Sequence, residues 1–355
     1  MHMADALISP AVGGTLWVVS GGWIAFCARK VKQTLRDNLV PLMGVLGAFI
    51  FAAQMINFSI PGTGSSGHLG GGLILTVLLG PYAAFLVMAS VLTVQAFFFA
   101  DGGLLALGCN IFNLGFFPAF VAYPLLYRAM VKRQDGASRA WVGAIIAAVV
   151  GLELGALGVV LETKASGISE LPFGTFLLMM LPIHLAIGVV EGLATAAVVS
   201  FVARARPEAL PMAPSVGGSG SLRPVLIGLA IAAVVMGGLA SWFASTYPDG
   251  LEWSMAKVSG KEELESPAAG IHARLAKIQE KTAFLPDYGF KSAEVAPEAV
   301  ATAEPAAAVA PEPWPRVSAG TSVAGIVGGL LTLALAGLIG IALRARSIQR
   351  ACANG

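Results

Sequence analysis

Long apolar runs constrain this chain more than any other feature of its sequence. Hydrophobic residues make up 56% of its 355 residues and charged residues only 12%, against roughly 25% in an ordinary soluble domain. Because lipid offers the backbone no hydrogen bonds, a segment that crosses it must be a helix or part of a closed barrel. The runs are about 20 residues long and show no alternation, which indicates helices. The sequence therefore predicts an all-α integral membrane protein.

Nine apolar segments are candidates for crossing the membrane. They lie at about 11–28, 39–58, 69–80, 81–100, 104–127, 140–161, 173–202, 224–244 and 322–343. The segment at 69–80 is too short to cross a hydrocarbon core of about 30 Å as a helix. We therefore expect the glycine-rich stretch before it, SIPGTGSSGHLGGG, to enter the protein as non-helical backbone and to carry His68 below the outer surface.

Basic residues give the orientation, because Lys and Arg in short loops favour the cytoplasmic side. They cluster at 29–36, 128–139, 204–223 and 344–350. These clusters alternate consistently with the nine segments and predict an N-terminus outside the cell and a C-terminus in the cytoplasm. The net charge of the whole chain is only +2, which gives no indication of nucleic-acid binding.

The chain divides into two membrane parts. Residues 1–203 hold seven predicted helices, and 224–343 hold two more that flank a large extracytoplasmic loop domain. A Pro/Gly/Ser-rich linker at 204–223 joins the parts, and 344–355 form a cytoplasmic tail. Within the outer loop, the Ala/Pro-rich stretch AEVAPEAVATAEPAAAVAPEPWP is expected to be extended or disordered.

The chain begins MHMADALISP, which places a histidine second. The amine of Met1, the amide of His2 and the His2 imidazole can form two adjoining chelate rings, with three nitrogens in one plane. His68 could supply a fourth nitrogen, although it could equally cap the helix that follows it. A planar set of nitrogens suits Ni(II) or Cu(II) better than Zn(II), which prefers a tetrahedron.

Several polar residues lie inside apolar segments, where ionisable groups are costly and usually functional or paired. Glu153 and Glu191 are two of them, and His184 lies two helical turns before Glu191, on the same helix face. One interpretation is that such residues orient a ligating imidazole or line an ion path, and the other is hydrogen bonding between helices. The residues considered for these roles are Asn110, Asn113, His184 and Glu191.

Four of these stretches together resemble a known family. They are MHMADALISP, the GHLGGG loop, ALGCNIFN and the HLAIGVVEG helix. They resemble the substrate-capture (S) component of energy-coupling factor (ECF) transporters for nickel and cobalt, the NikM/CbiM family, over residues 1–203. YPDGLEW at 247–253, LPDYGF at 285–290 and the following SVAGIVGGLL resemble the companion subunit NikN, with its PDGLE domain. The chain thus resembles a fusion of the two.

The resemblance implies a specific function. A seven-helix bundle would hold Ni²⁺, or alternatively Co²⁺, as transported substrate near the outer face, through Met1, His2 and His68. The chain would sit in the bacterial inner (cell) membrane and work with a membrane scaffold (T) subunit and cytoplasmic ATPase subunits. It would not itself be an enzyme, in keeping with the lack of a GxxxxGK[ST] phosphate loop in the sequence.

Two other functions are weaker readings of the same residues. A cation-coupled secondary transporter would use Glu153, His184 and Glu191, but the predicted helices show no obvious internal repeat. An intramembrane metalloenzyme would need an open coordination position, whereas four nitrogens fill a square plane and the sequence has no HExxH motif.

Overall fold

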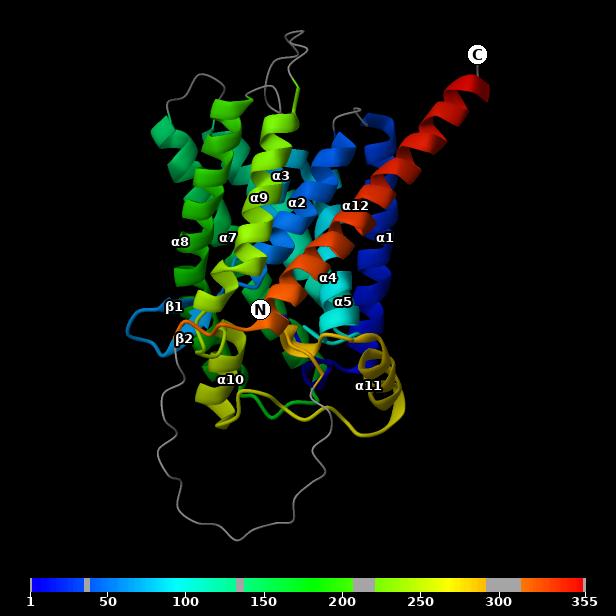
Figure 1. Ribbon diagram of the computed structural model, residues 1–355. Helices are drawn as coiled ribbons and strands as arrows, with labels where there is room; N and C mark the ends of the chain where they lie inside the picture. Colours follow the sequence, from blue (N-terminus) through cyan, green and yellow to red (C-terminus); the bar gives the residue numbers. More distant parts are fainter. Residues whose placement is uncertain (1, 35–38, 132–136, 207–220, 292–313, 354–355) are drawn as a thin grey trace.

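The computed structural model describes residues 2–34, 39–131, 137–206, 221–291 and 314–353. Within these ranges the chain forms a bundle of apolar helices, with a small hairpin and short helices gathered at one end (Figure 1). Three features considered from the sequence lie outside the described residues. They are Met1, the central part of the linker at 207–220, and most of the Ala/Pro-rich stretch, at 292–313.

Six helical segments among the described residues are long and apolar enough to cross a membrane. They are α1 (Pro10–Thr34), α4 with η2 (Pro81–Val94, Gln95–Phe99), α5 with η3 and α6 (Leu107–Ile111, Phe112–Tyr127, Arg128–Met130), α7 (Ala137–Ser166), α8 (Phe173–Ala205) and α12 (Ala319–Ala353). Shorter apolar helices are α2 (Leu39–Gln54), α3 (Gly72–Leu79) and α9 (Arg223–Gly238). The protein is therefore an all-helical, multi-pass membrane protein.

Helix α3 is short because a different structure precedes it. Strands β1 (Phe58–Ile60) and β2 (Ser65–Gly67) form an antiparallel hairpin in which Phe58 pairs with Gly67. The stretch before α3 is thus non-helical, as the sequence indicates, but the sequence pattern does not predict the hairpin itself. His68 follows β2 directly and is buried, while α3 begins only at Gly72.

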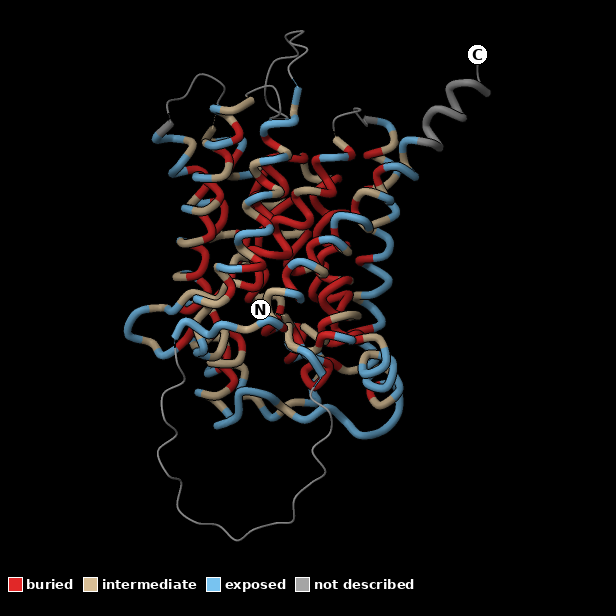
Figure 2. Tube along the Cα trace, in the orientation of Figure 1, coloured by how far each residue is buried: buried red, intermediate tan, exposed pale blue. Residues whose placement is uncertain are grey.

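Burial separates the central helices from the outer ones. The buried residues concentrate in the middle of the bundle (Figure 2). In the most apolar 18-residue stretch of the helix formed by α4 and η2, 78% of the stretch is buried inside the protein. In the corresponding stretch of α1, only 17% is buried. A helix with an exposed apolar surface of this kind suits contact with lipid, so α1 belongs to the periphery and α4 to the core.

The two ends of the bundle differ in composition. Helices α1, α8 and α12 end, and α9 begins, at the end drawn uppermost in Figure 1. Described basic residues at that end include Arg29, Arg204, Arg223 and Arg344. The opposite end carries the hairpin and the remaining short elements: η1 (Asp5–Leu7), η5 (Ala240–Phe243), α10 (Gly250–Ser259), α11 (Gly270–Thr282) and η6 (Pro286–Tyr288).

Candidate metal site

The N-terminal tip is built into the protein. The Met3 N–H donates to Asn110 Oδ1 at 2.8 Å, and the Asn110 Nδ2 donates back to the Met3 carbonyl at 3.2 Å. The same carbonyl accepts from the Gly103 N–H at 2.9 Å. Met3 is fully buried. Asn110 therefore fixes the backbone next to His2 and uses its amide on that backbone.

The residues after the tip are held equally firmly. Asp5 Oδ1 accepts from the Ala106 N–H at 2.9 Å, and His272 of α11 donates through Nε2 to the Ile8 carbonyl at 2.8 Å. A Cβ atom on Gly103 would overlap Asp5, so only glycine allows this close approach. These bonds fix where the N-terminal segment enters the bundle.

His2 and His68 meet, although 66 positions separate them. Their ring planes lie within 16° of parallel, with centroids 5.0 Å apart. Their side chains are only 7% and 8% exposed. The structure thus brings together the two imidazoles that the sequence analysis singled out.

Hydrogen bonds to two helices hold the loop that carries His68 in place. Glu191 of α8 accepts from the Gly70 N–H at 2.9 Å and from the Gly71 N–H at 3.1 Å, one bond to each carboxylate oxygen. Gln54 donates to the Gly70 carbonyl at 2.9 Å and accepts from Gln95 at 2.9 Å. Glu191 therefore positions the loop through its backbone.

Two carboxylates flank the pair of imidazoles. His2 Nδ1 lies 2.8 Å from Asp101 Oδ1, and His68 Nε2 lies 3.9 Å from Asp249 Oδ2. The Tyr288 hydroxyl of η6 donates to Asp101 Oδ2. The sequence analysis does not single out Asp101 and includes Asp249 only within the YPDGLEW signature, because the residues that face them lie far away along the chain.

Burial and charge set the protonation of these groups. Burial, reinforced by nearby positive charge that includes His2, lowers the pKa of His68 to about 3. Burial alone would raise the pKa of Asp101, but the His2 charge and the hydrogen bonds from His2 and Tyr288 outweigh it and hold that pKa well below its usual range. Burial alone would likewise raise the pKa of Asp249, but neighbouring positive charge and the hydrogen bond from the Glu252 N–H outweigh it and lower that pKa. A neutral imidazole beside ionised carboxylates favours a cation.

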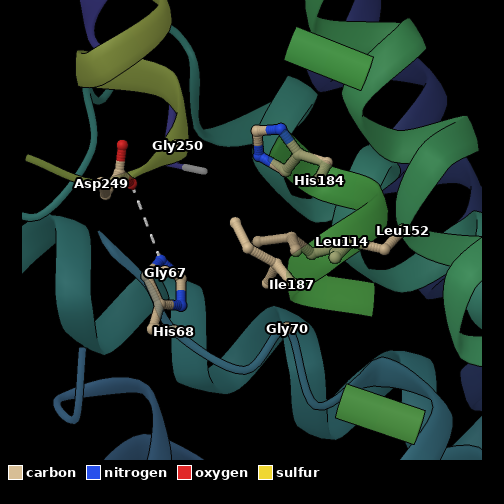
Figure 3. A pocket seen from close by; sticks show the side chains of 9 residues that line it. All are labelled: Gly67, His68, Gly70, Leu114, Leu152, His184, Ile187, Asp249 and Gly250. Atoms are coloured by element: carbon tan, nitrogen blue, oxygen red, sulfur yellow. Dashed lines mark ion pairs between the residues drawn. The ribbon is translucent and has the colours of Figure 1, made fainter. Parts of the chain in front are cut away.

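A small pocket adjoins His68 (Figure 3). It measures about 10 Å³, and Leu114, Leu152 and Ile187 form its apolar side. His184 also lines it, donates through Nδ1 to the Met180 carbonyl at 2.7 Å, and is 1% exposed. Its Nε2 has no hydrogen-bond partner among the described residues. His184 thus presents a buried nitrogen beside the site.

A larger cavity of about 500 Å³ adjoins the two imidazoles. The N-terminal segment, α11 and η6 contribute to its walls, and His2, His68, Asp101 and Asp249 all line it. This arrangement gives a dication a polar approach to the two imidazoles.

The remaining residues from the sequence analysis lie elsewhere. Asn113 donates to Glu162 at 2.8 Å, between helices. Glu153 has a buried oxygen without a partner among the described residues and lines neither cavity. Within the described ranges, no three His, Cys, Asp or Glu side chains are close enough to hold a metal ion. An ion between His2 and His68 therefore needs other donors as well, such as backbone nitrogens.

Residues 2–209 match the family model CbiM, the cobalt uptake substrate-specific transmembrane region. The chain belongs to the CbiM family. Residues 223–345 match the PDGLE domain, so the chain is a CbiM-family ECF transporter component fused to a PDGLE domain. Members of this family are nickel or cobalt transport components, and the family is not one of enzymes.

Relatives share the fused arrangement. The chain is 34% identical over 343 residues to the putative fused nickel transport protein NikMN of Archaeoglobus fulgidus, covering 94% of this chain and 96% of that one. It is 30% identical over 312 residues to the fused nickel transport protein NikMN of Rhodobacter capsulatus, covering 81% and 88%. A crystal structure of a truncated transition metal transporter superposes with a TM-score of 0.52 at 28% identity, covering 58% of this chain and 99% of that one.

Proposed function

We propose that this chain captures Ni²⁺ as the substrate-specific component of an ECF-type ABC transporter. The ion is held by the Met1 amine, the His2 amide and imidazole, and the His68 imidazole. The observation that carries the proposal is the pairing of two buried, nearly parallel imidazoles beside the anchored N-terminal tip. The fused nickel transport relatives support the choice of substrate.

The anchoring of Met3 explains how such a chelate is preorganised. The chelate ring that includes the His2 amide closes through Nδ1 of the same residue, and in this structure Nδ1 donates to Asp101. The His2 ring therefore exchanges this carboxylate for the ion during capture. His68 donates through Nδ1 to the Leu69 carbonyl at 3.1 Å, which leaves the lone pair on Nε2 to bind the metal.

The membrane arrangement that we propose has nine crossings or partial crossings. Seven helical segments belong to residues 1–203 and two to 224–343, with 204–223 as a cytoplasmic linker and 344–355 as a cytoplasmic tail. The end rich in Lys and Arg faces the cytoplasm, and the imidazole site faces outwards across a bacterial inner membrane. The short helices α2, α3 and α9 complete the bundle within the bilayer.

Energy for transport comes from other subunits. A membrane scaffold (T) subunit and cytoplasmic ATPases are the partners that membership of the CbiM family suggests. The chain itself contributes recognition of the ion, and the cavity that His2 and His68 line lies on the side opposite the basic end. Release therefore requires a movement that the partners drive.

Cobalt is the second candidate substrate, because the matching family model describes cobalt uptake. A flat array of nitrogens favours Ni(II), which accepts square-planar coordination. Direct competition between Ni²⁺ and Co²⁺ for the purified protein distinguishes the two. We expect nickel to displace cobalt.

Nickel content of the purified protein tests the proposed site. We expect stoichiometric Ni²⁺ in the natural chain and its loss in His2→Ala, in His68→Ala, and in a variant with one extra residue ahead of Met1, which moves the amine and spares both side chains. His272→Gln is the matched control, since glutamine keeps a donor for the Ile8 carbonyl. Nickel binding that survives all three changes would contradict the proposal.

A further inference from the structure

Helix α11 lies at the edge of the bundle, beside the start of a helix that is exposed to lipid. Its His272 donates through Nε2 to the Ile8 carbonyl at 2.8 Å, and α1 begins two residues later, at Pro10. Figure 1 draws α11 next to that end of α1. Because only 17% of the most apolar stretch of α1 is buried, α1 borders lipid, and α11 lies close to the surface of the bilayer.

One face of α11 attaches it to the rest of the protein. His272 and Gln279 are seven residues apart, about two helical turns, and therefore lie on the same face. Gln279 donates to the Ala96 carbonyl at 2.9 Å and to the Gly102 carbonyl at 2.7 Å. His272 is buried. These bonds fix how the helix lies on the bundle and thereby the directions of its other faces.

The neighbouring face is apolar and exposed. Ile271 and Ile278 directly precede His272 and Gln279, so they lie about 100° around the helix from the attached face. Their exposed fractions are 38% and 45%, and Phe284, just after the helix, is also 45% exposed. Large apolar side chains that are exposed together on one helix face suit contact with the hydrocarbon of a bilayer.

The next face is basic. Arg274 and Lys281 each follow one of the isoleucines by three residues, which places them about 60° further from the attached face. Lys277 lies beside them, and all three are exposed. Glu280, the only acidic residue of α11, lies about 100° from Lys281, on the side away from the isoleucines. The order around the helix is therefore attached, apolar and basic.

A helix at the surface of a membrane needs its faces in this order, because the apolar face meets acyl chains and the basic face meets the headgroups beside them. We propose that α11 is an interfacial helix whose basic face binds the phosphate groups of anionic phospholipids. Lys and Arg close to such a surface are attracted to its negative charge. A bilayer supplies hydrocarbon and phosphate side by side, which matches the two exposed faces of α11.

Hydrogen–deuterium exchange of the full chain in nanodiscs tests lipid binding by α11. One preparation contains phosphatidylcholine alone, and the other also contains phosphatidylglycerol. We expect phosphatidylglycerol to slow amide exchange in α11 at least about fivefold, the effect of one well-placed basic residue at an anionic surface. Equal rates in both preparations would overturn the proposal and leave these faces to a protein partner.

Removing the basic face should abolish this protection. In the double variant Arg274→Gln, Lys281→Gln, glutamine keeps a good helix former at both positions and the attached face is unchanged. We expect equal exchange of α11 in both kinds of nanodisc. Lys257→Gln with Lys261→Gln is the matched control, because it removes two exposed charges elsewhere in the same region and should keep the difference. Protection that persists in the first variant would exclude the basic face.

Two further measurements identify the source of the phosphate and the role of the apolar face. Inorganic phosphate added to phosphatidylcholine nanodiscs should not protect α11, and protection by phosphate alone would show a site for a free anion instead of a lipid. Ile278→Ser should exchange faster than the natural chain in both preparations, since contact with acyl chains does not depend on headgroup charge. Unchanged exchange in this variant would overturn the interfacial position. Thermal unfolding in detergent checks that all variants are folded.

Discussion

At the scale of single residues, the site separates the groups that face the ion from the groups that fix the backbone. Asn110 holds the chain beside His2, and Glu191 holds the loop beside His68. Neither side chain needs to touch the ion to affect its binding, because each determines where an imidazole lies. Asn110 and Glu191, which the sequence analysis placed inside apolar segments, are thus explained by the irregular backbone that they satisfy.

Removing the Glu191 clamp should damage both stability and capture. In Glu191→Ala the buried N–H groups of Gly70 and Gly71 lose their acceptors, at about 1–3 kcal/mol for each unsatisfied group. We expect a lower unfolding temperature and weaker nickel binding, measured by thermal unfolding and calorimetry. Glu170→Ala, an exposed glutamate before α8, is the control and should change neither. Equal behaviour of the two variants would show that the loop does not depend on the clamp.

Proton release on binding tests the amide ligand. A backbone amide binds nickel only after losing its proton, so capture should release at least one proton for each ion. Because burial keeps His68 neutral, His68 should contribute none. Calorimetric titrations in two buffers that differ in ionisation enthalpy give the number directly. Binding without proton release would exclude the amide as a ligand.

At the scale of helices, α12 joins the two parts of the chain by packing against α2 and α9. Its contact with α9 is very close: a Cβ on Gly325 would lie 2.3 Å from the Gly237 carbonyl oxygen. Small residues allow helix backbones to approach in membranes. The position of α12 therefore depends on this pair of glycines.

Gly325→Ala should weaken this helix contact. The added methyl group meets backbone atoms that cannot rotate away, and we expect a loss of about 1–3 kcal/mol in unfolding free energy. Gly337→Ala is the control, because a Cβ at this position of the same helix would have nothing within 4 Å, and it should be neutral or slightly stabilising. Denaturation of both variants in the same detergent provides the measurement, and equal stabilities would refute the close contact.

The sequence predicts the helices of this fold far better than its site. Apolar runs are local, so the segments at 81–100 and 173–202 nearly coincide with helices in the structure. The contacts of the hairpin with Tyr247 and of His68 with Asp249 join residues more than 180 positions apart, which no local pattern reveals. The pairing of His2 with His68 was predictable because a second-position histidine carries its own chelating backbone. Asp101 gave no comparable signal.

At the scale of the whole molecule, the proposed function places recognition and energy supply on different chains, which predicts conditional transport. We expect cells that produce this chain alone to retain nickel-binding protein in their membranes without accumulating the ion. Adding the T subunit and active ATPases should produce uptake, and ATPases with an inactivated phosphate loop should not. Radioactive nickel accumulation measures the difference. Uptake by the chain alone would favour a secondary transporter.

The bond between Ile8 and His272 joins positions 264 residues apart, and it has a consequence for biosynthesis. A ribosome releases the N-terminal end first, so His2 and His68 emerge long before α11 exists. The first residues made must wait for nearly three quarters of the chain before their final support arrives. The finished site therefore forms late, after most of the polypeptide has entered the bilayer, and a truncated translation product lacks the parts that complete it.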